Sequence, residues 1–156
     1  MTDGKLVRVN VHRGLPSQRH DTTGYAANQR QKAAWVKAGG DVIEAKMRPL
    51  RYPRDYPNTT EFPREKGVDV QLAVEAVEWV ITTKCDVAII FSHDTDLVPV
   101  IELLCRLKGT GSVETASWRS DYFNQRLRHP GVFHHGIRKE VFDKVETRVN
   151  YGRATT

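Results

Sequence analysis

The chain has 156 residues, of which 39% are hydrophobic and 28% are charged, and this composition excludes a generally disordered protein. Its length favours one domain with a sizeable core. Lysine and arginine outnumber aspartate and glutamate by 24 to 19, an excess that suits a polyanionic partner without establishing one. The longest unbroken apolar run, Val87–Phe91, is far shorter than the roughly 20 residues of a membrane span. The N-terminal segment also lacks the apolar core of a signal peptide, so we expect no membrane partner.

The two cysteines, Cys85 and Cys105, form no C-x-x-C pair and are too few for a disulfide framework. We expect both to be reduced thiols, which favours a cytoplasmic location.

The first part of the chain predicts two short strands around a helix. Leu6–Arg13 alternates between apolar and polar side chains, which is typical of a strand. Tyr25–Ala38 is rich in alanine and ends at a Gly-Gly pair, which indicates a helix with a glycine stop. Asp41–Met47 is a second strand. Residues 48–65 hold four of the seven prolines and predict a long irregular loop, a kind of loop that is usually functional or mobile.

The middle of the chain predicts the most regular elements. Val68–Thr83 is the strongest helix, because apolar residues recur along one stripe of it. The stripe consists of Val68, Leu72, Ala76 and Val80, and it is widened by Val70, Val74, Val77 and Ile81. Val87–Phe91 has no polar alternation, as in a strand covered on both faces of a parallel sheet. Leu97–Lys108 is a helix that ends before a glycine, and Gly111–Trp118 is a further strand.

The remaining residues are less regular. Val132–His135 predicts a last strand and Arg138–Val145 a short helix. The order of the elements predicts a three-layer α/β/α fold with a mainly parallel central sheet. We expect residues 1–150 to form a single domain and residues 151–156 a C-terminal tail.

Three aspartates belong to one edge of this predicted sheet. Asp69 lies in the first turn of the helix that starts at Val68, and Asp94 and Asp96 come directly after the Val87–Phe91 strand. Ligands of parallel α/β sheets bind along the carboxyl edge of the strands. Carboxylates that converge repel one another unless protons or a cation neutralise them, and oxygen ligands select hard cations. The three aspartates therefore suggest a site for Mg²⁺ or Mn²⁺.

Each aspartate also has a structural explanation. Asp96 precedes a helix and suits an N-cap, Asp94 suits a turn held through its own backbone, and Asp69 suits the positive end of a helix dipole. For each aspartate considered alone, the structural role is favoured. For the three aspartates considered together at one edge of the sheet, a metal site is favoured.

Basic residues accumulate near the same edge. They are Arg13 after the first strand, Arg48 and Arg51 after the second, Arg64 and Lys66 before the acidic helix, and Arg119 after the strand that ends at Trp118. An acidic centre inside a basic rim suits a substrate with many phosphates, since the rim holds the backbone while a metal polarises one phosphoryl group.

Three histidines, His129, His134 and His135, have no cysteine or acidic partner at a spacing typical of zinc sites. A surface or core role is favoured for them over a metal cluster.

Two stretches together resemble a known family. Lys66-Gly-Val-Asp-Val-Gln-Leu-Ala-Val74 opens the acidic helix, and Asp86-Val-Ala-Ile-Ile-Phe-Ser-His-Asp-Thr-Asp-Leu-Val-Pro99 carries the acidic turn. In this order and separation they form a specific double motif, by which the chain resembles the NYN domain family of PIN-like ribonucleases. The resemblance covers residues 5–120.

This resemblance implies a PIN-like fold and metal-dependent cleavage of RNA phosphodiesters. By matching position, it implies that Asp69, Asp94 and Asp96 are the catalytic and metal-site acids and that Lys66 contacts phosphate. His93 stands where the family commonly has a small residue, so it either crowds the metal or contacts the substrate. The expected nucleic-acid-binding residues are Lys66, Arg13, Arg51, Arg119 and His93.

Family members usually open with a strand that carries an aspartate, often written D-G-x-N. Here Asp3-Gly4 precedes Lys5 instead of ending an apolar strand, so it is not the equivalent. We therefore expect an N-terminally shortened domain in which the edges of two strands are exposed and one metal ligand is missing. Either the chain is a shortened form of a longer protein, or a second copy of the chain in a homodimer, or another partner, supplies the strand.

Two functions follow from these observations. The first is a metal-dependent endoribonuclease, in which Asp69 and Asp94 hold the ion and Asp96 ligates it or orients the attacking water. The second is a catalytically incomplete NYN-like module that binds RNA or a protein.

Overall fold

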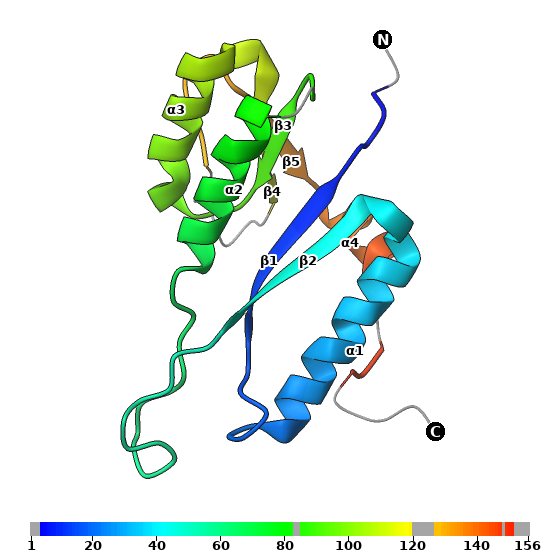
Figure 1. The fold of residues 1–156 in the computed structure, drawn as a ribbon. Helices are drawn as coiled ribbons and strands as arrows, with labels where there is room; N and C mark the ends of the chain where they lie inside the picture. Colours follow the sequence, from blue (N-terminus) through cyan, green and yellow to red (C-terminus); the bar gives the residue numbers. More distant parts are fainter. Residues whose placement is uncertain (1–3, 83–84, 120–126, 148, 152–156) are drawn as a thin grey trace. The chain divides into compact units, whose positions relative to one another are not determined.

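The computed structural model describes residues 4–82, 85–119, 127–147 and 149–151 (Figure 1). The chain divides into two compact units. The first consists of Met1–Gln71 together with Val149–Thr156, and the second of Leu72–Arg148. Each unit contains its own sheet, and the strands in both sheets are parallel.

The first unit contains two strands and one long helix. β1 (Val9–Leu15) pairs in parallel with β2 (Ile43–Pro49) along its whole length, and α1 (Thr22–Gly39) connects them. Asp21 caps α1 by accepting a hydrogen bond, 2.7 Å long, from the backbone amide three residues later. The helix ends before Gly40, whose φ of 56° favours a residue without a Cβ atom. The glycine stop predicted from the sequence is therefore confirmed.

The second unit contains three strands in the order β3-β4-β5. Its elements are α2 (Val68–Thr82, which begins in the first unit), β3 (Ala88–Phe91), α3 (Val98–Lys108), β4 (Val113–Trp118), β5 (Phe133–Ile137) and α4 (Lys139–Val145). Short 3-10 turns cover Gly40–Val42 in the first unit and Thr95–Leu97 and Thr110–Ser112 in the second. The alternation of helices with parallel strands confirms the predicted α/β class.

The core of the second unit lies between its sheet and the helices α2 and α3 (Figure 1). Ile101 and Leu104 of α3 pack there against Val113 of β4, and all three are fully buried. Strand side chains alternate between the two faces of a sheet, so Trp118 of β4 points to the opposite face. There its ring contacts that of Phe142 in α4, with the ring centroids 5.3 Å apart. Helices thus contact both faces of this sheet.

Two expectations about burial are wrong. Val87–Phe91 was expected to be covered on both faces, but Ile89 is 53% exposed and Phe91 is 49% exposed. These two side chains point away from α2 and α3, so the core covers only their neighbours in the strand. Along α2 the exposed side chains include Val70, Val74 and Ile81, because the helix packs against the core through its other face, which consists of Leu72, Ala73, Ala76, Val77 and Val80.

Three further predictions concern the C-terminal tail, the two cysteines and the absence of a membrane span. Of the predicted C-terminal tail, residues 152–156 lie outside the described residues, and the carbonyl of Tyr151 accepts a hydrogen bond from Arg30 Nε at 2.8 Å. Cys85 and Cys105 are both free thiols, and burial raises the pKa of Cys105. Among the described helices none is long and apolar enough to cross a membrane.

The buried position of α3 leads to a first prediction. Leu104→Ala removes a fully buried side chain and leaves a cavity, so it should lower the free energy of unfolding by about 2–5 kcal/mol. Leu107→Ala makes the same change on the same helix at a residue that is 45% exposed, and it should cost much less. Urea denaturation followed by circular dichroism measures both. Equal losses in the two variants would contradict the core described above.

Candidate metal and RNA site

Asp94 and Asp96 lie in the turn that links β3 to α3. Asp94 begins the 3-10 turn over Thr95–Leu97, where its Oδ1 accepts a hydrogen bond from the Asp96 amide at 2.8 Å. The amide of Asp94 in turn donates to Ser92 Oγ at 3.0 Å. These bonds fix the backbone that carries both carboxylates. The predicted turn-forming role of Asp94 is confirmed.

The two carboxylates differ in how many of their oxygens are occupied. The hydrogen bond to Asp96 uses one oxygen of Asp94. Asp96 is exposed, and its carboxylate makes no hydrogen bond or ion pair with any described residue. It is not an N-cap, because α3 begins after Leu97 without a side-chain cap. The structural explanation for Asp96 is therefore wrong, and its two oxygens are available to a ligand.

Basic side chains follow the neighbouring strands at the same edge. Parallel strands end together, and the hydrogen bond from the Ser92 amide to the Ala116 carbonyl, 3.0 Å long, extends the pairing of β3 with β4 toward the acidic turn. Arg119 follows β4, and its amide donates to the carbonyl of Ile137, the last residue of β5, at 2.6 Å. Arg138 comes next. The half-buried His93 lies at this edge too, between β3 and Asp94.

Arg138 was missed by the sequence analysis. The last strand was predicted to end at His135, whereas β5 continues to Ile137 and therefore delivers the next residue to the carboxyl edge. The side chains of both Arg119 and Arg138 are exposed, and neither forms an ion pair with a described residue. Both guanidinium groups are thus available to an anion.

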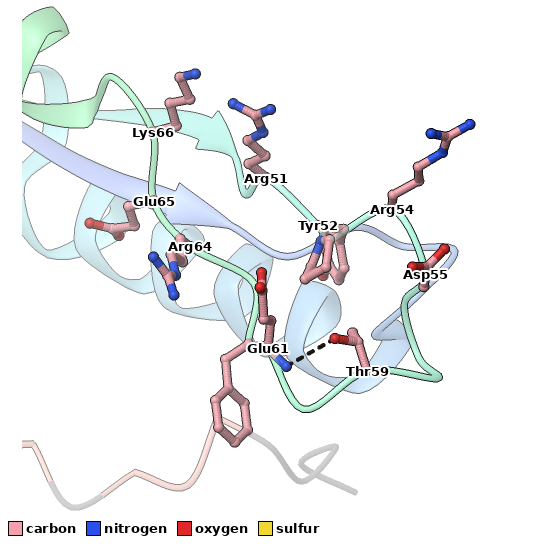
Figure 2. A pocket seen from close by; sticks show the side chains of 11 residues that line it. Arg51, Tyr52, Arg54, Asp55, Thr59, Glu61, Arg64, Glu65 and Lys66 are labelled. Atoms are coloured by element: carbon pink, nitrogen blue, oxygen red, sulfur yellow. Dashed lines mark hydrogen bonds between the residues drawn. The ribbon is translucent and has the colours of Figure 1, made fainter.

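The other predicted site residues belong to the first unit. Asp69 is exposed in the first turn of α2, without a hydrogen bond or ion pair to a described residue. Lys66 and Arg51 line a groove beside the proline-rich loop (Figure 2). Arg13 is half-buried, donates to Gln31 Oε1 and lies 6.0 Å from the centre of the Trp35 ring. Only part of the guanidinium of Arg13 remains for a phosphate.

The donor set fits a hard divalent cation. Mg²⁺ usually binds through one or two carboxylates together with waters and substrate phosphates. Asp94 and Asp96 supply two carboxylates from one turn, within the second unit. Across the described ranges, no three His, Cys, Asp or Glu side chains are grouped so that they alone would hold a metal ion. Substrate or water oxygens would complete the coordination.

Two of the three histidines, His134 and His135, have structural partners. His134 lies between two hydroxyl groups, with its Nδ1 2.9 Å from Thr115 Oγ1 and its Nε2 3.1 Å from Ser117 Oγ. His135 Nε2 is 2.5 Å from Glu114 Oε2. These contacts join β5 to β4. They confirm the structural role that the sequence favoured for this pair.

Comparison with known proteins agrees with this architecture. The parallel α/β sheet with an acidic turn at its carboxyl edge is consistent with the PIN-like fold class. The family model of the NYN domain matches residues 18–128. The chain therefore belongs to the NYN domain family, which is a PIN-like nuclease family. No curated protein and no solved structure matches the chain significantly.

The hydrogen bond from Asp96 to Asp94 leads to a second prediction. Asp94→Ala removes the acceptor and should lower the free energy of unfolding by about 0.5–2 kcal/mol. Asp94→Asn keeps an oxygen acceptor at the same place, so it should cost less. Thermal and urea unfolding of the two variants measure the difference. If Asn and Ala are equally destabilising, the hydrogen bond does not hold this turn.

Proposed function

We propose that the chain is a metal-dependent endoribonuclease that cleaves RNA phosphodiester bonds. The observation that carries the proposal is the exposed Asp96 carboxylate, which lacks a partner among the described residues and shares a turn with Asp94. This turn follows a parallel strand, at the edge where such sheets bind ligands. Membership of a PIN-like nuclease family supports the same chemistry.

The residues would divide the work as follows. Asp94 and Asp69 would hold Mg²⁺ or Mn²⁺, and Asp96 would ligate the ion or orient the attacking water. When bound, the ion lowers the pKa of that water and stabilises charge on the scissile phosphate. Arg119 and Arg138 would hold the RNA backbone near the acidic turn, and Lys66, Arg51, Arg13 and His93 would also bind the RNA.

The second candidate is an RNA-binding or protein-interaction module without a complete catalytic site. It is favoured because no third acidic or imidazole ligand lies near Asp94 and Asp96 among the described residues.

We also propose a cytoplasmic location, since both cysteines are free thiols.

Cleavage of a labelled RNA in Mn²⁺ tests the nuclease directly. Asp94→Asn and Asp96→Asn should each reduce the rate by on the order of 100-fold, because each removes charge from the proposed metal site. EDTA should abolish cleavage by the unchanged protein. The same assay on Asp69→Asn tests whether this residue belongs to the site.

Asp86→Asn is the matched control. Asp86 is also exposed and lies next to β3, but it precedes the strand, at the opposite edge from the acidic turn, so its loss should leave the rate unchanged. Cleavage that survives EDTA and both turn variants would refute the metal mechanism. RNA binding without turnover, combined with no Mn²⁺ binding by electron paramagnetic resonance, would favour the module.

The proposed partner strand would pair with β3. Among the described residues β3 pairs only with β4, and the exposed side chains Ile89 and Phe91 give it an apolar character. Edge strands usually carry charges or prolines that prevent further pairing. A strand from a second copy of the chain, or from another protein, would satisfy this edge.

Sedimentation equilibrium tests the homodimer. Ile89→Lys introduces a charge on the edge strand and should shift a dimer toward monomer, whereas Leu107→Lys on α3 should not. A protein that is monomeric at every concentration would exclude the second copy as the source of the strand.

A further inference from the structure

The proline-rich loop over residues 50–66 is attached firmly to the first unit. Arg51 and Arg64 exchange backbone hydrogen bonds of 2.9 and 3.0 Å, which close the loop at its base. The Leu50 amide donates to the Leu15 carbonyl at 2.9 Å, and the Gly14 amide donates to Glu65 Oε1 at 2.7 Å. A Cβ atom at Gly14 would lie 2.5 Å from Leu50 Cδ2 and 2.7 Å from Glu65 Cγ. A side chain at position 14 would therefore have to displace the side chains of Leu50 and Glu65.

An aromatic cluster holds the next part of the loop. Tyr52 Oη accepts a hydrogen bond from the Ser17 amide at 2.9 Å. The Tyr52 ring stacks on His20 with the centroids 4.6 Å apart, and the ring of Tyr56 packs edge-on against Tyr52 at 4.9 Å. The loop is therefore ordered before any ligand binds, which lowers the entropy cost of binding.

The loop borders an open groove of ≈ 580 Å³ that is lined by four cations (Figure 2). They are Arg51, Arg54, Arg64 and Lys66. None of their side chains forms an ion pair or hydrogen bond with a described residue. Figure 2 shows Arg51, Arg54 and Lys66 extending to one side of the loop and Arg64 to the other. Unpaired cations on both sides favour an extended polyanion over a single small anion.

Phe62 gives this groove a second kind of contact. It lines the groove with the cations, and it is 82% exposed, the highest exposed fraction among the large apolar side chains of the described residues. An aromatic ring in water among unpaired cations is the arrangement that single-stranded nucleic acids use, since bases stack on the ring while phosphates meet the cations. The aromatic rings of Tyr52 and Tyr56 are occupied with each other, so Phe62 is the ring available for stacking.

We propose that the groove beside the loop over residues 50–66 binds an unpaired segment of RNA. Phe62 stacks on one base, and the cations that line the groove, among them Arg51, Arg54 and Arg64, contact phosphates along the same segment. This inference rests on the proposed function for its choice of RNA as the substrate. It adds a binding subsite in the first unit and a requirement for unstacked bases.

The acids in the groove are consistent with base recognition. Glu65 is engaged by the Gly14 amide, which leaves Asp55 and Glu61 as the carboxylates without a side-chain partner among the groove residues. Carboxylates repel phosphates but accept hydrogen bonds from the amino groups of bases, such as N4 of cytosine. A ligand with exposed base edges therefore suits this mixture better than a simple polyphosphate. In a duplex, neighbouring base pairs already cover the base faces.

Fluorescence anisotropy of the full chain in EDTA measures this binding without cleavage. The probes are a short unstructured RNA and a duplex RNA of the same length. Phe62→Ala should weaken binding of the single strand roughly 5- to 100-fold and change duplex binding little, whereas Phe62→Trp should retain single-strand binding. Phe133→Ala removes another exposed aromatic ring, in the second unit, and should have no effect.

The cations are tested by salt dependence. Arg54→Gln should reduce the slope of log affinity against log salt by about 0.7 for the single strand, because one phosphate contact is lost. Lys108→Gln, at an exposed lysine of α3, should leave the slope unchanged. Unchanged single-strand binding in Phe62→Ala, or an unmodified chain that binds no RNA in EDTA, would overturn the inference. Binding that depends on Phe62, in a chain that never cleaves RNA with Mn²⁺, would retain the inference and refute the nuclease.

Discussion

Parallel strand pairing is the constraint on which the candidate chemistry depends. A chain that forms a parallel ladder has to cross back after every strand, so all strands leave the sheet at the same edge. In the second unit this brings Asp94, Arg119 and Arg138 to one edge, although each follows a different strand. In the first unit the same rule ends β2 beside β1, and the loop over residues 50–66 starts from that point.

The sequence predicts an element well where its side chains repeat with one period and pack in one core. The predicted bounds of α2 and α3 lie within one residue of the observed ones, because buried residues such as Val80, Ile101 and Leu104 recur at helical spacing. The bounds of β5 are harder to predict, because the strand carries a polar residue, His134, that contacts two hydroxyl groups of β4 and interrupts the apolar pattern. An apolar run such as β3 also does not reveal which of its faces lacks a covering element.

The candidate site was only partly predictable for a similar reason. The position of Asp94 and Asp96 after a strand is visible in the sequence, whereas their different roles depend on one backbone hydrogen bond in a 3-10 turn. The groove depends on contacts between distant residues, such as Arg51 with Arg64. Nothing in the pattern around Phe62 distinguishes an exposed ring from a buried one, so the sequence alone does not single this residue out.

The contact between Gly14 and the loop links strand geometry to ligand affinity. A larger residue at position 14 would have to push the side chains of Leu50 and Glu65 aside, which would weaken the hydrogen bond from the Gly14 amide to Glu65 and loosen this attachment of the loop to β1. A nucleotide that binds a loosened loop also has to order it, and the lost conformational entropy weakens the complex. Gly14, at a buried position of β1, thereby contributes to the rigidity of the proposed RNA platform.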